Sequence, residues 1–366
     1  MEEATAGKLK RTAVILLRLC MFALAGWLLY RTVSGNGTDF LAVCLNAPTP
    51  SLLLLAFLLY GAAQFAGARR WQTLLKAVQL PIGFWSALRL TLVGNFFSLA
   101  LPGAVTGDVV KVAYATRIHP GRAVELTLVD LMDRLVGVAG LVCAAALATI
   151  PGYINGAFAW ETGQAPLFTR VVGRFAWPAL RWLALLYILY RMRHLLMRLS
   201  FLQRAVAAVG RRLPRLVKAP LLRLNAALNL YDRRQGALWK ALGLSVVIHL
   251  FLLSGVNCAI GCAIRPWHFS NDRSFSDYAL VTQVSNATGL VAITPGGIGL
   301  RDMAAADLYN NYLNTYRANE QLYNAAIPLI NSLVIVLWGL VGALLYGLGK
   351  PLLSKQSPTS NIETSV

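Results

Sequence analysis

The chain has 366 residues, of which 57% are hydrophobic and only 13% are charged. A soluble globular protein carries about 25% charged residues, and a mean hydropathy of +0.57 is too high for that class. The formal net charge of +19 raises nucleic-acid binding as an alternative, but no soluble basic domain with interleaved aromatic residues accompanies the charge. We therefore expect an all-α polytopic membrane protein that binds no nucleic acid and concentrates Lys and Arg in its cytoplasmic loops.

Six apolar runs are candidates for transmembrane helices, which need roughly 20 residues each. They are Ala13–Tyr30, Ser51–Ala68, Val136–Ile150, Trp177–Tyr190, Ala241–Ile264 and Ala325–Leu348. Basic residues mark the cytoplasmic side of a span, and Lys8, Lys10 and Arg11 precede the first run. No convincing cleavage site follows that run, so it is expected to remain a span. We expect a multi-pass protein of the inner (plasma) membrane with both termini in the cytoplasm.

Two other segments, residues 84–117 and 276–317, place helix-breaking residues inside apolar sequence. The breaks are Leu101-Pro102-Gly103 in the first segment and Pro295-Gly296-Gly297 in the second. Broken backbone at membrane depth is tolerated only where protein buries it or a wet cavity receives it. We interpret both segments as re-entrant helical hairpins of opposite orientation, with 84–117 entering from the cytoplasm and 276–317 from outside.

The two hairpins are similar in outline. NFFSLALPGAVTGDVVKVAYA and NATGLVAITPGGIGLRDMAAA both run from Asn through Pro-Gly to an acid and a helix of small residues. We interpret 1–152 as a first repeat of two spans, a hairpin and a third span, 153–190 as an external loop and fourth span, and 241–350 as the remainder of an inverted second repeat. Such repeats with interrupted helices point to a transporter's binding site. Coincidence is the alternative, because short glycine-proline breaks are common.

Residues 191–240 form a distinct basic segment. From Arg191 to Lys240 twelve Lys or Arg residues alternate with leucines at roughly helical spacing. A basic amphipathic segment of this kind lies on an anionic leaflet, and an ordinary positive-inside loop is the alternative. A cytosolic enzyme partner bound through 191–240 and a homo-oligomer also stay open. The tail, 351–366, is expected to be disordered in the cytoplasm.

Ionisable groups in a span cost at least ~2.5–3.5 kcal/mol on insertion scales, so they are functional candidates by default. In the first half of the chain the candidate substrate-binding residues are Asn95, Pro102, Gly103, Asp108, Lys111, Asp133 and Arg134. Asp108 either caps the short helix or contacts substrate or a proton. Asp130 and Arg134 are four residues apart, acid first, which favours a local pair. Asp133 then needs another partner, for which we expect Lys111.

In the second half the candidates follow the same pattern. They are Thr294, Pro295, Gly296, Gly297, Arg301 and Asp302. The helix N-terminus after the glycines offers free N–H groups to an anion, and Arg301 adds a bidentate phosphate donor. The alternative is a cluster of Arg301 and Asp302 that pins the two hairpins together. His249, inside a span, is expected to make an interhelical hydrogen bond.

Metal and cofactor sites are not expected. The four histidines lack the spacing of a zinc site, and the five cysteines include no CxxC pair.

The motifs LPGAVTGDVVKVA, DRL at 133–135 and TPGGIGLRD resemble the flippase-like transmembrane domain of lysylphosphatidylglycerol synthases. The resemblance covers about residues 10–350 and implies lipid translocation. Relatives often have Glu-Arg where this chain has Asp133-Arg134, and Glu where it has Asp302, so the acidic side chains here are shorter. No aminoacyltransferase domain follows Leu353. We therefore expect a stand-alone member of the family that lacks the synthase activity.

From the charges and the resemblance together we expect a transporter of an anionic phospholipid or polyprenyl-phosphate lipid, and not an enzyme. Lys111, Arg134 and Arg301 would supply positive charge, with Asp108, Asp133 and Asp302 as counter-charges or proton carriers. The alternative is a membrane-embedded catalytic or accessory subunit that acts on lipid-linked sugars or lipid headgroups. A protein that merely anchors an enzyme is the third reading.

Overall fold

The computed structural model describes a helical protein. The described residues are 43, 47–100, 106–157, 167–196, 229–231, 233–265, 273–291, 294, 297–311 and 320–348. They form helices and short connections, without a strand in these ranges. The predicted first span Ala13–Tyr30, most of 191–240 and the tail 351–366 lie outside the described residues. So do Pro102, Gly103, Pro295 and Gly296.

Four helical stretches are long and apolar enough to cross a membrane. The first two are in α3 (Pro50–Ala77) and in α6 (Ala123–Ala157), where the stretch is Ala123–Pro151. The third, Gln235–Ile264, is continuous through α10 (Gln235–Val246), the π-helix η1 (Val247–Leu253) and α11 (Ser254–Ile264). The fourth, Leu322–Gly347, is in α14 (Glu320–Gly347). Four of the six predicted spans are therefore present as membrane-length apolar helices.

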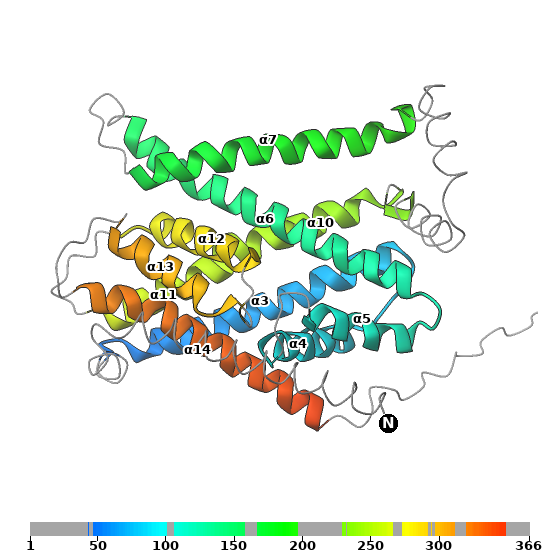
Figure 1. Cartoon of the computed structure of the whole chain (residues 1–366), viewed down its shortest axis with the longest axis horizontal. Helices are drawn as coiled ribbons and strands as arrows, with labels where there is room; N and C mark the ends of the chain where they lie inside the picture. The colour runs from blue at the N-terminus through cyan, green and yellow to red at the C-terminus, as the bar shows by residue number, and fades with distance from the viewer. Residues whose placement is uncertain are drawn as a thin grey trace, which may run out of the picture.

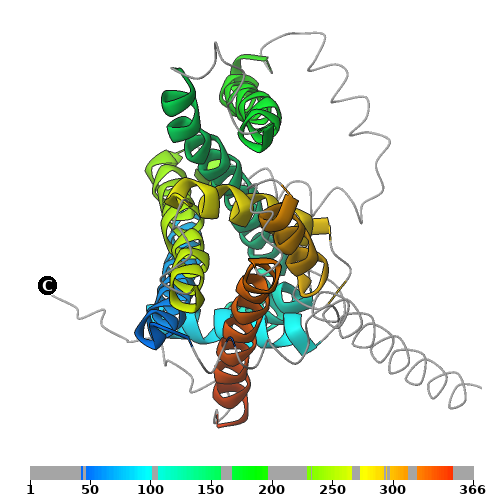
Figure 2. The same cartoon turned by 90° about the vertical axis from the view of Figure 1, so that its left-hand side faces the viewer.

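The predicted span Trp177–Tyr190 lies in helix α7 (Leu167–Leu196), which is not among these four stretches. Arginines interrupt its sequence, LFTRVVGRFAWPALRWLALLYILYRMRHLL, and lower its hydropathy. The helix packs mainly on α6 and lies at the periphery of the bundle (Figures 1 and 2). The number of six spans therefore stays a prediction.

Both segments interpreted as hairpins are pairs of packed helices. The first pair is α4 (Phe84–Ala100) and α5 (Thr106–Ile118), and the second is α12 (Phe275–Val291) and α13 (Leu300–Asn311). In Figure 1 the long helices run along the long axis, and the two pairs lie towards its opposite ends. The two segments are therefore helical hairpins, and their re-entry into the membrane stays a prediction.

The first hairpin closes through glycines. A Cβ added to Gly107 would collide with the carbonyl oxygen of Gly94 and with Ser98 Oγ, so the two arms approach backbone to backbone here. In the second hairpin Gly297 has φ +72° and lies against the backbone of Gly289. A left-handed φ of this kind favours glycine, which explains why the predicted break in the helix is built from glycine.

Each hairpin packs on a long helix of both halves of the chain, and the two hairpins do so in equivalent positions. The first arm of each one packs on the last long helix of the other half, α4 on α14 and α12 on α6. The second arm packs on the long helix that follows it in sequence, α5 on α6 and α13 on α14. The helices α3 and α11 also pack together. As a result, residues far apart in sequence meet in the middle of the bundle.

Each hairpin has an apolar core of its own. The core beside α4 and α5 includes Trp71, Leu74, Leu90 and Leu126. The core beside α12 and α13 includes Ile260, Tyr278, Leu280, Tyr309 and Ile327. Polar residues from helices beside both cores, among them several functional candidates, line a cavity.

Candidate functional site

A cavity of about 390 Å³ lies between the two hairpins. Cavities that bind ligands have volumes of roughly 300–1,000 Å³, so this one is large enough for a small polar group. Six predicted site residues line it, which are Asn95, Asp108, Lys111, Asp133, Arg134 and Arg301. They come from α4, α5, α6 and α13, so both hairpins contribute to a single cavity.

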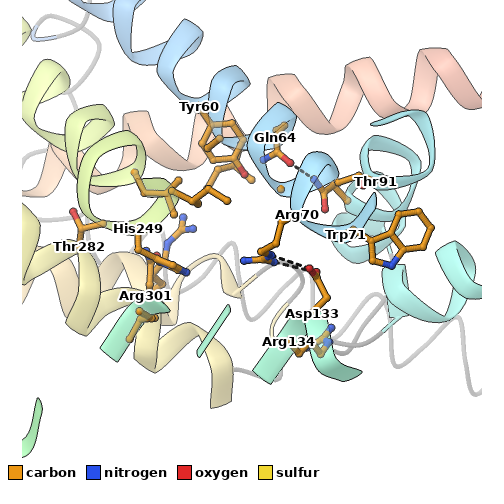
Figure 3. Close-up of a pocket in the computed structure, with 18 of the residues that line it drawn as sticks. Tyr60, Gln64, Arg70, Trp71, Thr91, Asp133, Arg134, His249, Thr282 and Arg301 are labelled. Atoms are coloured by element: carbon orange, nitrogen blue, oxygen red, sulfur yellow. Dashed lines mark hydrogen bonds and ion pairs between the residues drawn. The ribbon is translucent and has the colours of Figure 1, made fainter. Parts of the chain in front are cut away.

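Arg70 of α3 is the partner of Asp133. Its Nε and Nη2 donate to the two carboxylate oxygens at 2.8 and 3.0 Å, and its Nη1 donates to Ser245 Oγ at 2.8 Å. The prediction that Lys111 pairs with Asp133 is therefore wrong. Arg70 thus forms the bidentate geometry that an Arg–carboxylate pair allows, and it is not among the predicted site residues. Figure 3 shows this pair as two dashed lines.

Lys111 instead binds Asp130, with Nζ 2.6 Å from Oδ1, and lies 3.9 Å from Asp108 Oδ1. Its ammonium also lies 4.6 Å from the centre of the Trp71 ring, within the range of a cation–π interaction. Lys111 is only 6% exposed. The predicted local pair of Asp130 and Arg134 is wrong, because α5 packs on this face of α6 and brings a lysine to Asp130.

Arg134 forms an ion pair with Asp108 of the first hairpin. Asp108 is in the first turn of α5, where a negative charge interacts favourably with the helix dipole. The two side chains retain 38% and 24% of their exposure, for Arg134 and Asp108 respectively. Because they are the most exposed ion pair of the cavity wall, they are the charges most available to an incoming ligand.

The second hairpin presents its charges differently. Arg301 Nη2 donates to Asp302 Oδ1 at 3.0 Å and to Ser332 Oγ of α14 at 2.6 Å. Asp302 also accepts from Gly299 N–H at 3.0 Å and from the Ser332 hydroxyl at 2.7 Å. The predicted Arg301–Asp302 pair is therefore present, but its hydrogen bonds among the described residues connect α13 to α14 and not to the first hairpin.

Three predicted residues of the second hairpin that the structure describes, Thr294, Gly297 and Asp302, lie outside the cavity wall. Asp302 is fully buried behind Arg301, and Thr294 is 4% exposed. Neither they nor Gly297 line the cavity. Asp302 therefore supports Arg301, and the glycines shape the turn that places it.

Neutral polar side chains complete the wall, and the sequence reasoning missed most of them. They are Tyr60, Gln64, Thr91, His249, Asn257, Thr282, Asn286 and Asn331. Asn95 Nδ2 donates to Gln64 Oε1 at 2.6 Å, and Asn257 Nδ2 donates to Thr282 Oγ1 at 2.8 Å. The signal was available, because Gln64, Asn257 and Asn331 interrupt runs that are otherwise apolar.

His249 occupies an irregular part of its span. It lies in the π-helix η1, where its backbone carbonyl accepts from Gln283 Nε2 of α12 at 2.9 Å and from Ser254 Oγ at 2.9 Å. These bonds are made by the backbone of His249, so the interhelical hydrogen bond expected of its side chain stays a prediction. Single π-helical turns are frequent at functional sites, and this one places the His249 ring in the cavity near Arg301 (Figure 3).

The chemistry of the wall follows from these contacts. Four cations line it, Arg70, Lys111, Arg134 and Arg301, and each has a carboxylate partner, although Asp130 and Asp302 lie behind the surface. Within the described part of the chain no three His, Cys, Asp or Glu side chains gather as metal ligands would. The arrangement can hold a polar or singly anionic group by hydrogen bonds and exchange of ion pairs.

The sequence matches the model of a known protein family. Residues 15–318, more than half of the chain, match the model of a family described as the lysylphosphatidylglycerol synthase TM region. The match includes both hairpins and α6, and ends before α14. No curated protein and no solved structure matches the chain.

Proposed function

Because the chain belongs to the family of the lysylphosphatidylglycerol synthase TM region, we propose that it is a transporter that moves an anionic phospholipid or a polyprenyl-phosphate lipid across the inner membrane. Membership identifies a lipid-related membrane protein with several apolar helices. The observation that carries the finer proposal is a cavity to which both hairpins contribute charged and polar side chains, among them Lys111, Arg134 and Arg301.

The proposed binding step uses the headgroup only. A phosphate entering the cavity accepts hydrogen bonds from Arg134, whose present partner Asp108 is partly exposed and can release it. Arginine is suited to this exchange because its guanidinium binds phosphate and carboxylate in the same bidentate geometry. Arg301 contributes a second donor from the opposite hairpin. The acyl chains stay in the lipid, since the cavity holds about 390 Å³.

The proposed movement is a rocking of the two halves about this cavity. The reciprocal packing of α4 on α14 and of α12 on α6 supports an inverted repeat, because each hairpin then contacts equivalent helices of the opposite half. In transporters built from such repeats, one repeat moves against the other around a fixed site. We propose that the hairpins are re-entrant and that their charged tips alternate between the two membrane faces.

Transport is proposed in preference to catalysis. The alternative, a subunit that modifies lipid-linked sugars or lipid headgroups, requires a chemically altered product. An assay that follows both the position and the mass of the lipid therefore separates the two functions. The role of residues 191–240, as a membrane-surface or partner-binding segment, stays a prediction.

The test is a flip assay in liposomes that contain the purified protein and phosphatidylglycerol labelled on one acyl chain with a fluorophore. A membrane-impermeant reductant quenches outer-leaflet label, so transport exposes the inner-leaflet pool over time. Arg134→Gln should reduce the rate at least about tenfold. Arg122→Gln is the matched control, because Arg122 also pairs with an acid, Glu125 at 2.9 Å, but does not line the cavity.

Two results would contradict the proposal. One is that wild-type protein moves neither labelled phosphatidylglycerol nor a labelled polyprenyl phosphate faster than empty liposomes. The other is that Arg134→Gln and Arg122→Gln both transport as fast as the wild type. Recovery of a lipid of changed mass would instead support the enzyme alternative.

A further inference from the structure

Five amide side chains surround the cavity, each from a different helix. They are Gln64 of α3, Asn95 of α4, Asn257 of α11, Asn286 of α12 and Asn331 of α14. Two of them, Asn95 and Asn257, use their amide N–H groups on Gln64 and Thr282. Within the described part of the chain, Asn286 and Asn331 make no side-chain hydrogen bond. The amides therefore reach the cavity with donors and acceptors to spare.

Such a wall is suited to a polar ligand. Gln64, Asn95, Asn286 and Asn331 are half-buried side chains of the cavity wall. A ligand that displaces water from them must supply hydrogen bonds in its place, because an unpaired amide in a dry site is unfavourable. An amide presents both donors and an acceptor. A phosphate only accepts and an ammonium group only donates, whereas a hydroxyl does both. Amides on several sides of one cavity are therefore complementary to a group with several hydroxyls.

The charges of the wall agree with a headgroup that is not cationic. Four cations and two carboxylates, Asp108 and Asp133, line the cavity directly. An additional ammonium group would meet more cations than carboxylates at the cavity surface, so it is bound less favourably there than an anion, although Asp130 and Asp302 behind the surface offset part of the positive charge. A single phosphate is accommodated by Arg134 or Arg301, as proposed above. The remaining wall contains the amides, the hydroxyls of Tyr60, Thr91 and Thr282, and apolar side chains that include Leu141, Ile248 and Ile335.

We propose that the headgroup is an uncharged polyol ring, of the sugar or inositol type, attached to the lipid through a phosphate. This inference rests on the proposed transport function and names the class of its substrate. In Figure 3 the Arg70–Asp133 pair lies on one side of the cavity and His249 with Arg301 on another, with Tyr60 and Gln64 near the open space between them. The ring occupies that space, its hydroxyls paired with the amides and its phosphate on an arginine.

The experiment compares three lipids with the same labelled acyl chain in the flip assay: phosphatidylinositol, phosphatidic acid and phosphatidylethanolamine. Phosphatidic acid has the phosphate without a ring, and phosphatidylethanolamine has an ammonium in place of one. Wild-type protein should move phosphatidylinositol about tenfold faster than either, because without the ring the amides of the wall lose their hydrogen-bond partners.

The variant Asn286→Leu/Asn331→Leu tests the amides directly. It should lose about tenfold in the rate for phosphatidylinositol while its rate for phosphatidic acid changes less than about twofold. Thr91→Val and Thr127→Val form a matched control pair. Each hydroxyl donates to the carbonyl four residues earlier in its own helix at 2.9 Å, but only Thr91 lines the cavity. Thr127→Val should therefore transport like the wild type, and a monodisperse elution profile shows that each variant is folded.

The outcomes separate this inference from the proposed function. If wild-type protein moves phosphatidic acid or phosphatidylethanolamine as fast as phosphatidylinositol, transport stands and the polyol headgroup is wrong. If the amide variant keeps the wild-type preference for phosphatidylinositol, the amides do not recognise the ring and the inference is also wrong. If the protein moves none of these lipids nor those of the preceding test, both proposals fail.

Discussion

The two hairpins use similar sequences to hold their charges in opposite ways. In the first, Asp108 pairs with Arg134 of another helix, and the two side chains keep 24% and 38% of their exposure. In the second, Arg301 pairs with its neighbour Asp302, which is fully buried and also accepts hydrogen bonds from Gly299 and Ser332. The first hairpin thus has charges that can exchange partners, and the second has a fixed, locally neutralised arginine.

The difference suggests a division of labour between two similar motifs. An exposed ion pair contributes little to stability, typically 0–1 kcal/mol, so its breakage by a ligand is cheap. A buried pair is costly to break because one charge is left without compensation. We infer that the first hairpin exchanges ion pairs with the cargo while the second anchors the turn that presents Arg301.

The largest expected effect is on the buried pair. Asp302→Ala leaves Arg301 without its carboxylate and removes the acceptor for Gly299 N–H, so it should destabilise the fold by about 3–5 kcal/mol. Asp108→Ala in the first hairpin should cost no more than about 1 kcal/mol, because Lys111 keeps Asp130 and Arg134 is partly exposed. Thermal unfolding in detergent measures both. Equal losses would remove the distinction between the two hairpins.

The second prediction concerns the glycines at which the arms meet. Gly107→Ala places a Cβ against the carbonyl of Gly94 and should destabilise the protein by about 1–3 kcal/mol through overpacking. Gly289→Ala is the matched change in the second hairpin. Its new Cβ would lie 3.9 Å from Arg301 Cβ, an ordinary contact, so stability should change by less than about 0.5 kcal/mol. Chemical denaturation measures the loss of stability in both variants. A greater loss in Gly289→Ala than in Gly107→Ala would contradict the prediction.

The smallest effect is expected from two threonines of the cavity wall. Thr282→Val removes the acceptor for Asn257 Nδ2 and should cost about 1 kcal/mol. Thr91→Val removes only a hydrogen bond to the carbonyl of Ala87 in its own helix, and should be close to neutral in stability. The unfolding midpoints of the two variants, measured under the same condition, show which substitution costs more stability. A greater loss from Thr91→Val would show that the first hairpin is the more rigid of the two.

The sequence was sufficient to predict four long apolar helices and the positions at which the two hairpins turn. Apolar runs of membrane length predicted four helices that the structure contains, and glycine and proline near positions 102 and 296 predicted where each hairpin turns. The family also followed from the motifs, and the match over residues 15–318 confirms it. These properties depend on residues that are close together in the chain, so local composition is enough to predict them.

The partners of the charges could not be predicted in this way. Arg70 and Asp133 are 63 residues apart, and the prediction that Lys111 pairs with Asp133 is wrong because Arg70 of α3 binds that carboxylate while Lys111 binds Asp130. Asp130 and Arg134 share a helix face, but α5 packs on that face and supplies a partner to each. Helix periodicity predicts which residues share a face, and only the packing of a second helix decides what that face meets.

The amides of the cavity show most clearly the difference between what the sequence predicts and what the packing of helices decides. The sequence by itself determined that Gln64, Asn257 and Asn331 lie inside apolar helices, where a polar group needs a hydrogen bond. The tertiary structure alone decided that they face one cavity with Asn95 and Asn286, because the direction of a side chain around its helix becomes meaningful only when the neighbouring helices are in place. Each of these helices therefore contributes its own polar residues, and the packing of the two hairpins on the long helices brings those residues together as a site.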